Sequence, residues 1–149
     1  YETAATEAGL EPRREDWKIA RTVFLADTTR EAEERARRNT IAIVHEYVAK
    51  AIQRRSGLGV MKRNLSMPDS DVDVNYFMRE LVIAGDVDTV LDRLLQLWEE
   101  IGPFGTLMMM EFDWMDEDDR RAWLYSTELF IGELLPRLNA AVGATVNVG

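Results

Sequence analysis

The chain has 149 residues, a formal net charge of −9, a sequence pI of about 4.7 and no cysteine. The acidic balance argues against nucleic acid and anionic membrane surfaces as partners, and the lack of cysteine excludes disulfides, thiolate catalysis and cysteine-bound metals. No apolar run approaches the ~20 residues that span a bilayer, and the length suffices for one domain with its own core.

The first predicted elements are the tail of a helix and a long strand. Residues 1–9 have the composition of a helix end, and because the chain starts at Tyr1 rather than Met, we expect the sequence to begin inside a longer protein. Residues 17–26 read as a strand with two apolar faces, one of which also carries Arg21. A buried arginine there would need a partner.

A helix follows this strand. Thr28 and Glu31 fit a capping box, in which the threonine caps the helix and the glutamate lies three residues later. Apolar side chains at helical spacing extend the helix to about Arg54, where glycines stop it. Residues 58–73 form a polar connection, and residues 74–79 a short helix.

The most regular stretch, residues 80–114, predicts a strand-helix-strand unit. Residues 81–84 are apolar on both faces, as in a parallel strand covered by helices. Asp86 is placed to cap the next helix, whose apolar stripe ends at Gly102. Residues 106–110 form the second strand, and its run of three methionines should point alternately to opposite faces and pack in the core.

The last part predicts an acidic loop, an amphipathic helix over residues 120–138 and a flexible tail over residues 140–149. Pro136 is expected to kink or end the helix. Three parallel strands that alternate with helices indicate an α/β fold. Because three strands cannot close a barrel and would leave apolar edges open, the residues indicate a piece of a larger α/β domain.

Several groups could carry chemistry, and each has a structural alternative. Asp27, Thr28 and Asp86 are interpreted as helix caps rather than ligand contacts. His45, the single histidine, has no second histidine or cysteine with which to share a metal. Five residues have the spacing of a calcium-binding loop, but Val74 stands where that loop needs glycine. These five are Asp69, Asp71, Asp73, Asn75 and Glu80.

Five stretches resemble the carboxyl-terminal part of luciferase-like, flavin-dependent monooxygenases, in particular the subgroup related to limonene and alkanal monooxygenases. They are WKIARTVFLADTTREAEERA, SMPDSDV, LVIAGDVDTVLDRLLQLWEEIGPFGTL, MMMEFDW and STELFIGELLPRL. That family folds as a (β/α)8 TIM barrel, so the resemblance implies that residues 17–26, 81–84 and 106–111 are strands six to eight. Residues 57–79 then form an insertion before the seventh strand, and the first five strands are absent.

The resemblance also implies an activity. The parent enzyme would be an FMN-dependent monooxygenase, a flavoprotein oxidoreductase that oxygenates a small organic substrate with reduced flavin and O2 through a C4a-peroxyflavin. Its partners would be a separate flavin reductase and further copies of itself, its location the cytoplasm, and its alternative cofactor the deazaflavin F420. Because much of the family's flavin contact lies in the absent part, this chain alone is expected to be inactive.

The carboxyl ends of barrel strands are where barrel enzymes place their chemistry. Glu111, Asp113 and Trp114 follow the last strand, and we expect them to form a wall over the flavin ring or the substrate. The structural alternative makes Asp113 a turn residue and packs Trp114 on the last helix. No catalytic residue and no metal ligand is assigned. The alternative to an enzyme is a non-catalytic α/β half-barrel module that self-associates to cover its strand edges.

Overall fold

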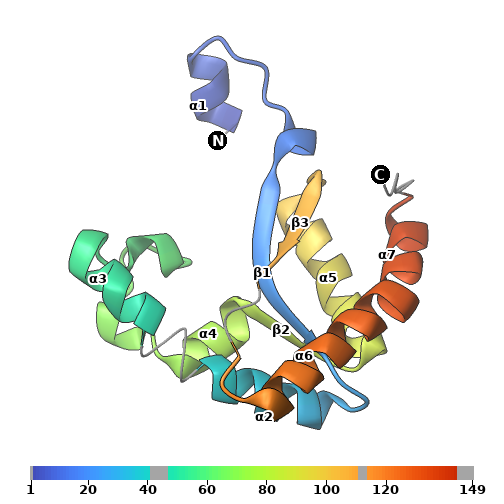
Figure 1. Ribbon diagram of the computed structural model, residues 1–149. Helices are drawn as coiled ribbons and strands as arrows, with labels where there is room; N and C mark the ends of the chain where they lie inside the picture. The colour runs from blue at the N-terminus through green and yellow to red at the C-terminus, as the bar shows by residue number, and fades with distance from the viewer. Residues whose placement is uncertain (1, 41–46, 111–113, 144–149) are drawn as a thin grey trace.

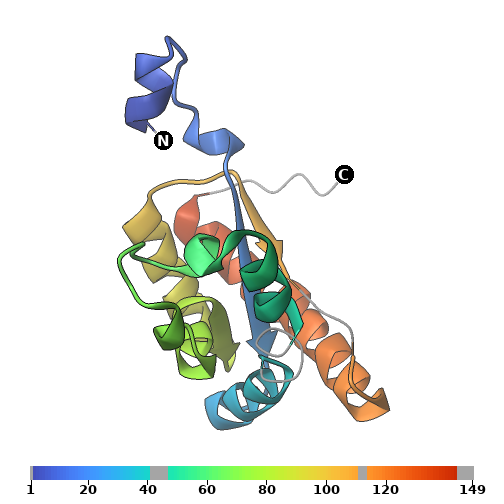
Figure 2. The same ribbon diagram turned by 90° about the vertical axis from the view of Figure 1, so that its left-hand side faces the viewer.

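The computed structural model describes residues 2–40, 47–110 and 114–143. It has a three-stranded parallel sheet in the order β2-β1-β3, with helices against both faces (Figures 1 and 2). The strands are β1 (Lys18–Leu25), β2 (Val82–Gly85) and β3 (Thr106–Met109). The α-helices are α1 (Glu2–Glu7), α2 (Thr29–Asn39), α3 (Lys50–Ser56), α4 (Val74–Glu80), α5 (Val87–Ile101), α6 (Glu117–Leu129) and α7 (Leu135–Val142). Shorter helical turns are η1 (Arg14–Asp16), η3 (Leu58–Met61), η4 (Asp69–Asp71) and η5 (Phe130–Leu134).

Strand β1 is the centre of the sheet and pairs with a different neighbour in each half. Its carboxyl half aligns Thr22 with Val82 of β2, whereas its amino half aligns Lys18 with Thr106 of β3. Successive residues of a parallel strand turn their N–H and C=O groups to opposite edges. Thr22 N–H donates to the carbonyl of Leu81, while the carbonyl of Arg21 accepts from Met110 N–H, so the two neighbours lie on opposite edges.

This strand order differs from that of three consecutive barrel strands, in which β2 would lie between β1 and β3. The connection from β1 to β2 steps in one direction, and the connection from β2 to β3 steps back across β1. Because such crossovers are almost always right-handed, the reversal places the two connecting helices on opposite faces. The expectation of a barrel slice is therefore not confirmed by the arrangement of the strands.

Two hydrophobic clusters fill the space between the sheet and its helices. On one face, α5 packs Val90 and Leu94 against the odd-numbered side chains of β1. On the other face, α2 packs Ala32 and Ala36 against the even-numbered ones, which include Phe24. Helix α6 adds Trp123 to this second cluster, with ring centroids 4.7 Å apart from Phe24 in an edge-to-face contact. The carboxyl half of β1 is consequently buried on both faces.

The amino half of the sheet has one bare face. Leu107 and Met109 pack against the first cluster, so the predicted alternation is confirmed, but core packing of all three methionines is wrong. Met108 and Met110 lie on the other side, with 42% and 37% of their surface exposed, and Ala20 on β1 is also exposed. We call Ala20, Met108 and Met110 the methionine face.

The predicted helix boundaries are confirmed where capping signals were present. Thr28 Oγ1 accepts from Glu31 N–H at 3.3 Å at the start of α2. Asp86 Oδ1 accepts from Thr89 N–H at 2.8 Å at the start of α5, and Gly102 ends that helix with a φ of 85°. Arg14 donates to the carbonyl of Ile101, which is one of the carbonyls that a helix end leaves without a partner.

The connection before β2 is more ordered than a polar loop. Turn η3 and helix α4 enclose a small core of their own, built around Phe77 and Tyr76. The Tyr76 hydroxyl donates to the carbonyl of Met61 at 2.8 Å and accepts from Arg63 N–H at 2.7 Å. The helix predicted to run to Arg54 is described as α2 and α3, and residues 41–46, including His45, lie outside the described residues.

The final helical path is longer than the sequence predicted. Helix α6 begins at Glu117, passes through the π-helical turn η5 and continues as α7 to Val142 (Figure 1). Pro136 does not end the helix. It directly follows the π-helical turn η5, in which Leu135 N–H bonds to the carbonyl of Phe130, and the helical backbone continues through the proline. The predicted tail over residues 140–149 therefore starts as helix, and residues 144–149 lie outside the described part. None of the described helices has both the length and the hydropathy of a membrane span.

Candidate functional site

The carboxyl ends of β1 and β2 lie together and are joined by a small polar network. Thr29 Oγ1 donates to Asp86 Oδ2 at 3.0 Å and accepts from Asp86 N–H at 3.2 Å. Thr89 Oγ1 lies 2.9 Å from the same hydroxyl. The Thr89 amide and hydroxyl, followed by the Thr29 hydroxyl, lower the pKa of Asp86 by hydrogen bonding to its carboxylate. Because its carboxylate is engaged by the protein itself, Asp86 is a cap, as predicted.

Gly85 is required by this network. A Cβ at that position would lie 2.7 Å from Cγ2 of Thr89, which is closer than real Cβ atoms approach. The backbone of β2 thus comes within contact distance of the first turn of α5. The hydrogen bonds between Thr29 and Asp86 then join the end of β2 to the residues that follow β1.

A hollow of about 210 Å3 opens at the end of β1, against α2 and α6. Asp27 lines it, and the Tyr125 hydroxyl donates to Asp27 Oδ1 at 2.6 Å. Arg35 also lines the hollow, where it forms ion pairs with Glu31 at 3.3 Å and with Asp118 at 3.0 Å. We call this hollow the Asp27 pocket.

The hydrogen bond to Asp27 raises the pKa of Tyr125, because the carboxylate stabilises the protonated phenol. Tyr125 therefore keeps its proton and acts as a hydrogen-bond donor near neutral pH, not as a base. The interpretation of Asp27 as a helix cap was wrong, since Thr28 caps α2 and Asp27 faces Tyr125. The pocket can hold a small polar group between a carboxylate and the guanidinium groups of Arg35 and Arg121.

Of the three residues predicted to form the wall, only Trp114 can be placed. Glu111 and Asp113 lie outside the described residues. Trp114 is 43% exposed, and the guanidinium of Arg120 on α6 lies 5.5 Å from the centre of its ring. This contact matches the structural alternative, in which the tryptophan packs on the last helix. Its role beside a flavin stays a prediction.

The residues with calcium-loop spacing serve other purposes in the structure. Asp73 caps α4 by accepting from Tyr76 N–H at 2.8 Å, and Asp69 pairs with Lys62 at 2.5 Å. Glu80 pairs with Arg79 at 2.8 Å. Among residues 2–40, 47–110 and 114–143, no three metal-ligand side chains are grouped so that they could hold an ion.

Sequence reasoning missed the partners of Asp27. Tyr125 falls on the polar side of a helix that starts 90 residues later, and no local pattern brings it to the end of β1. Arg35 and Arg121 look like ordinary surface charges in their own helices. Only the packing of α6 across α2 and β1 assembles these side chains.

The Asp27 pocket does not fit a flavin by itself. Sites for ligands of that size enclose roughly 300–1,000 Å3, and this pocket encloses about 210 Å3. The described residues can therefore supply an edge of such a site but not the whole of it.

The known proteins that the chain resembles are named as monooxygenases, and one of them was solved in complex with FMN. The chain is 32% identical over 140 residues to 3,6-diketocamphane 1,6-monooxygenase of Pseudomonas putida, which covers 93% of this chain and 36% of that enzyme. It is 29% identical over 147 residues to 4-hydroxyprotoasukamycin monooxygenase of Streptomyces nodosus subsp. asukaensis, which covers 98% of this chain and 37% of that enzyme. The chain thus spans little more than a third of these relatives. No family model matches it.

Solved structures give the same result. The oxygenating constituent of 3,6-diketocamphane monooxygenase of Pseudomonas putida, a type II Baeyer-Villiger monooxygenase in complex with FMN, matches with a TM-score of 0.67 and 28% identity. The match covers 92% of this chain and 38% of that one. A monooxygenase from Streptomyces bottropensis matches with a TM-score of 0.57 and 20% identity, which supports the fold alone. The narrower likeness to limonene and alkanal monooxygenases stays a prediction.

Proposed function

We propose that the chain is the carboxyl-terminal part of an FMN-dependent monooxygenase whose complete form is a (β/α)8 barrel. The observation that carries this proposal is the similarity of 93% of the chain to little more than a third of a diketocamphane monooxygenase. The FMN complex, which matches 92% of the chain, supports FMN over F420 as the cofactor. The first five strands of the barrel would come from outside this chain.

The bare methionine face supports the same proposal. Ala20, Met108 and Met110 are exposed on a sheet whose other half is buried on both faces. In a complete barrel β2 would lie between β1 and β3, so the proposal requires β3 to leave β1 and pair with β2. The pairing with β1 that β3 would lose covers only residues Lys18–Arg21 of β1.

The proposed reaction is the oxygenation of a small organic substrate by O2, with reduced FMN supplied by a separate reductase. The names of the relatives make a cyclic ketone the best-supported substrate class. FMN, when bound, would supply the oxygen chemistry. This chain would supply one side of the site, where we place Glu111, Asp113 and Trp114 at the end of β3 and Asp27 at the end of β1.

A chimera tests the proposal. This chain would replace the matching segment of 3,6-diketocamphane 1,6-monooxygenase, and FMN binding and ketone oxygenation would be measured with reduced FMN supplied chemically. We expect a folded chimera that binds FMN and retains measurable oxygenation, and that does neither with F420. A chimera that folds by circular dichroism but binds no FMN would refute the assignment.

The rival function is a non-catalytic module that self-associates, in which the methionine face would lie between two copies of the chain. Sedimentation of the isolated chain distinguishes the two when it is read with the chimera. A stable dimer together with a folded chimera that neither binds FMN nor oxygenates the ketone would favour the module. Oxygenation by the chimera would favour the enzyme whatever the oligomeric state of the isolated chain.

A further inference from the structure

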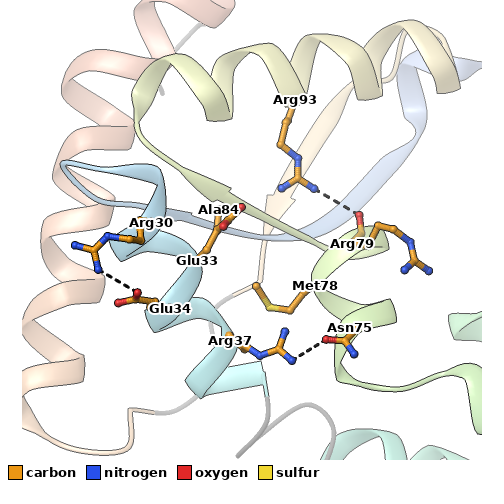
Figure 3. Close-up of a pocket in the computed structure, with 9 residues that line it drawn as sticks. All are labelled: Arg30, Glu33, Glu34, Arg37, Asn75, Met78, Arg79, Ala84 and Arg93. Carbon is orange, nitrogen blue, oxygen red and sulfur yellow. Dashed lines mark hydrogen bonds and ion pairs between the residues drawn. The ribbon is translucent and has the colours of Figure 1, made fainter.

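A second hollow, of about 570 Å3, lies between α2 and α4 beside the free edge of β2 (Figure 3). Arg30 and Arg37 line it from α2, Arg79 from α4 and Arg93 from α5. In Figure 3 the guanidinium groups of Arg30 and Arg79 turn outward, away from the centre of the hollow. None of its lining residues belongs to the Asp27 pocket. We propose that this arginine hollow binds a small organic anion that carries two separate negative groups, either carboxylate or phosphate. The proposal concerns the chain on its own, with β2 at the edge of the sheet, and not the complete barrel, in which β3 would cover this edge.

Two of the four guanidinium groups are already neutralised by carboxylates. Arg30 pairs with Glu34 at 3.1 Å, and Arg79 pairs with Glu80 at 2.8 Å. Exposed ion pairs of this kind contribute little to stability, but each carboxylate neutralises the positive charge of its arginine at the hollow.

The other two guanidinium groups have only neutral partners. Arg37 Nη2 donates to the amide Oδ1 of Asn75 at 2.7 Å, and Arg93 Nη2 donates to the carbonyl of Val82 at 2.9 Å. Within the described ranges, neither side chain has a carboxylate partner. Each guanidinium has five N–H donors, so most of the donors of Arg37 and Arg93 remain available to a ligand.

Both side chains are held in place before any ligand binds. The bond from Arg93 also closes the exposed edge of β2, because Val82 turns its carbonyl away from β1. Figure 3 shows Arg93 and Arg37 on opposite sides of the space, with Met78 and Ala84 between them. A guanidinium fixed by the protein loses less entropy on binding an anion than a free one does.

This arrangement selects the ligand. Two cationic groups across an apolar floor match an anion whose charges are separated by a short carbon or phosphate-ester linkage. Glu33 also lines the hollow, and none of the described residues pairs with its carboxylate. That carboxylate repels anions, so its removal should strengthen anion binding, whereas removal of an arginine should weaken it.

The experiment is a titration of the 15N-labelled chain, followed through the side-chain N–H signals of arginine. Glutarate and pyrophosphate are the two probes, and sodium chloride at matched ionic strength is the reference. Arg37→Gln is the main variant, because Asn75 is the only side-chain partner of Arg37 among the described residues, and we expect the variant to fold. Arg55→Gln in α3, outside the hollow, is the matched control.

We expect saturable shifts with at least one probe in the millimolar range, and the better probe identifies carboxylate or phosphate as the ligand chemistry. Loss of a charge-assisted hydrogen bond in Arg37→Gln should weaken binding about fivefold or more. Glu33→Gln should strengthen binding, and Arg55→Gln should leave it unchanged. Shifts that follow sodium chloride for both probes, or equal binding by the parent chain and Arg37→Gln, would overturn the proposal.

Discussion

Replacing Ser126 by alanine should destabilise the fold, because its hydroxyl accepts a hydrogen bond from the half of one β1 edge that β3 does not cover. Strand β3 pairs only with residues Lys18–Arg21, so the amide of Leu25 on the same edge lies beyond its reach. Ser126 Oγ, on α6, accepts from that amide at 2.8 Å, and Ser126 is fully buried.

The size of the effect follows from what remains after the change. Alanine removes the acceptor but hardly changes the volume, so the main cost is a buried amide without a partner. Such a group costs ~1–3 kcal/mol. With a loss of ~2 kcal/mol and an m-value of ~2 kcal/mol/M, the midpoint of urea unfolding should fall by ~1 M.

Equilibrium unfolding in urea, followed by tryptophan fluorescence, measures this shift. The control is Ser70→Ala, since Ser70 is exposed and its hydroxyl bonds only to Asp71 within the part of the chain that the structure describes. We expect Ser70→Ala to leave the midpoint unchanged. An equally small effect for Ser126→Ala would refute the claim that α6 takes the place of a missing strand on this edge.

Three further predictions concern single positions. A Cβ at Gly105 would lie 1.7 Å from a backbone carbonyl oxygen, so Gly105→Ala should strongly destabilise the fold in thermal unfolding. A Cβ at Gly132 would meet open space, so Gly132→Ala should stabilise the fold by ~0.5–1 kcal/mol in the same assay. The pKa of Asp86 is lowered in the folded protein, so its charge stabilises the fold above the unfolded pKa. The difference in unfolding free energy between the parent chain and Asp86→Asn should therefore be largest near pH 7 and shrink as the pH falls below ~4, and a difference independent of pH would contradict this. Asp27→Asn should lower the pKa of Tyr125 in an ultraviolet titration, with Tyr125→Phe identifying the signal; an unchanged pKa would show that the bond to Asp27 is not its cause.

Local signals in the sequence predicted the elements well. The three strands and the caps Thr28, Asp86 and Gly102 are found where periodicity and capping chemistry placed them. The prediction that Pro136 could end the helix was wrong, because the helical path continues through the π-helical turn η5 into α7. That turn has no clear signature in the sequence.

Long-range pairing was not predictable in the same way. Which edge of β1 receives β3 depends on competition between strands far apart in the sequence, and local patterns say nothing about it. The same limit hid the Asp27 pocket, whose hydrogen bond joins residues 98 positions apart. Residue types alone assigned Asp27 to a cap, because an aspartate just before a helix is usually one.

Titration of the isolated chain with FMN, followed by flavin fluorescence, tests the central claim most directly. In our proposal, these residues form one side of a flavin site and the remaining strands supply the rest. The proposal predicts no saturable binding at micromolar FMN. Stoichiometric, tight binding of FMN by the chain alone would contradict it.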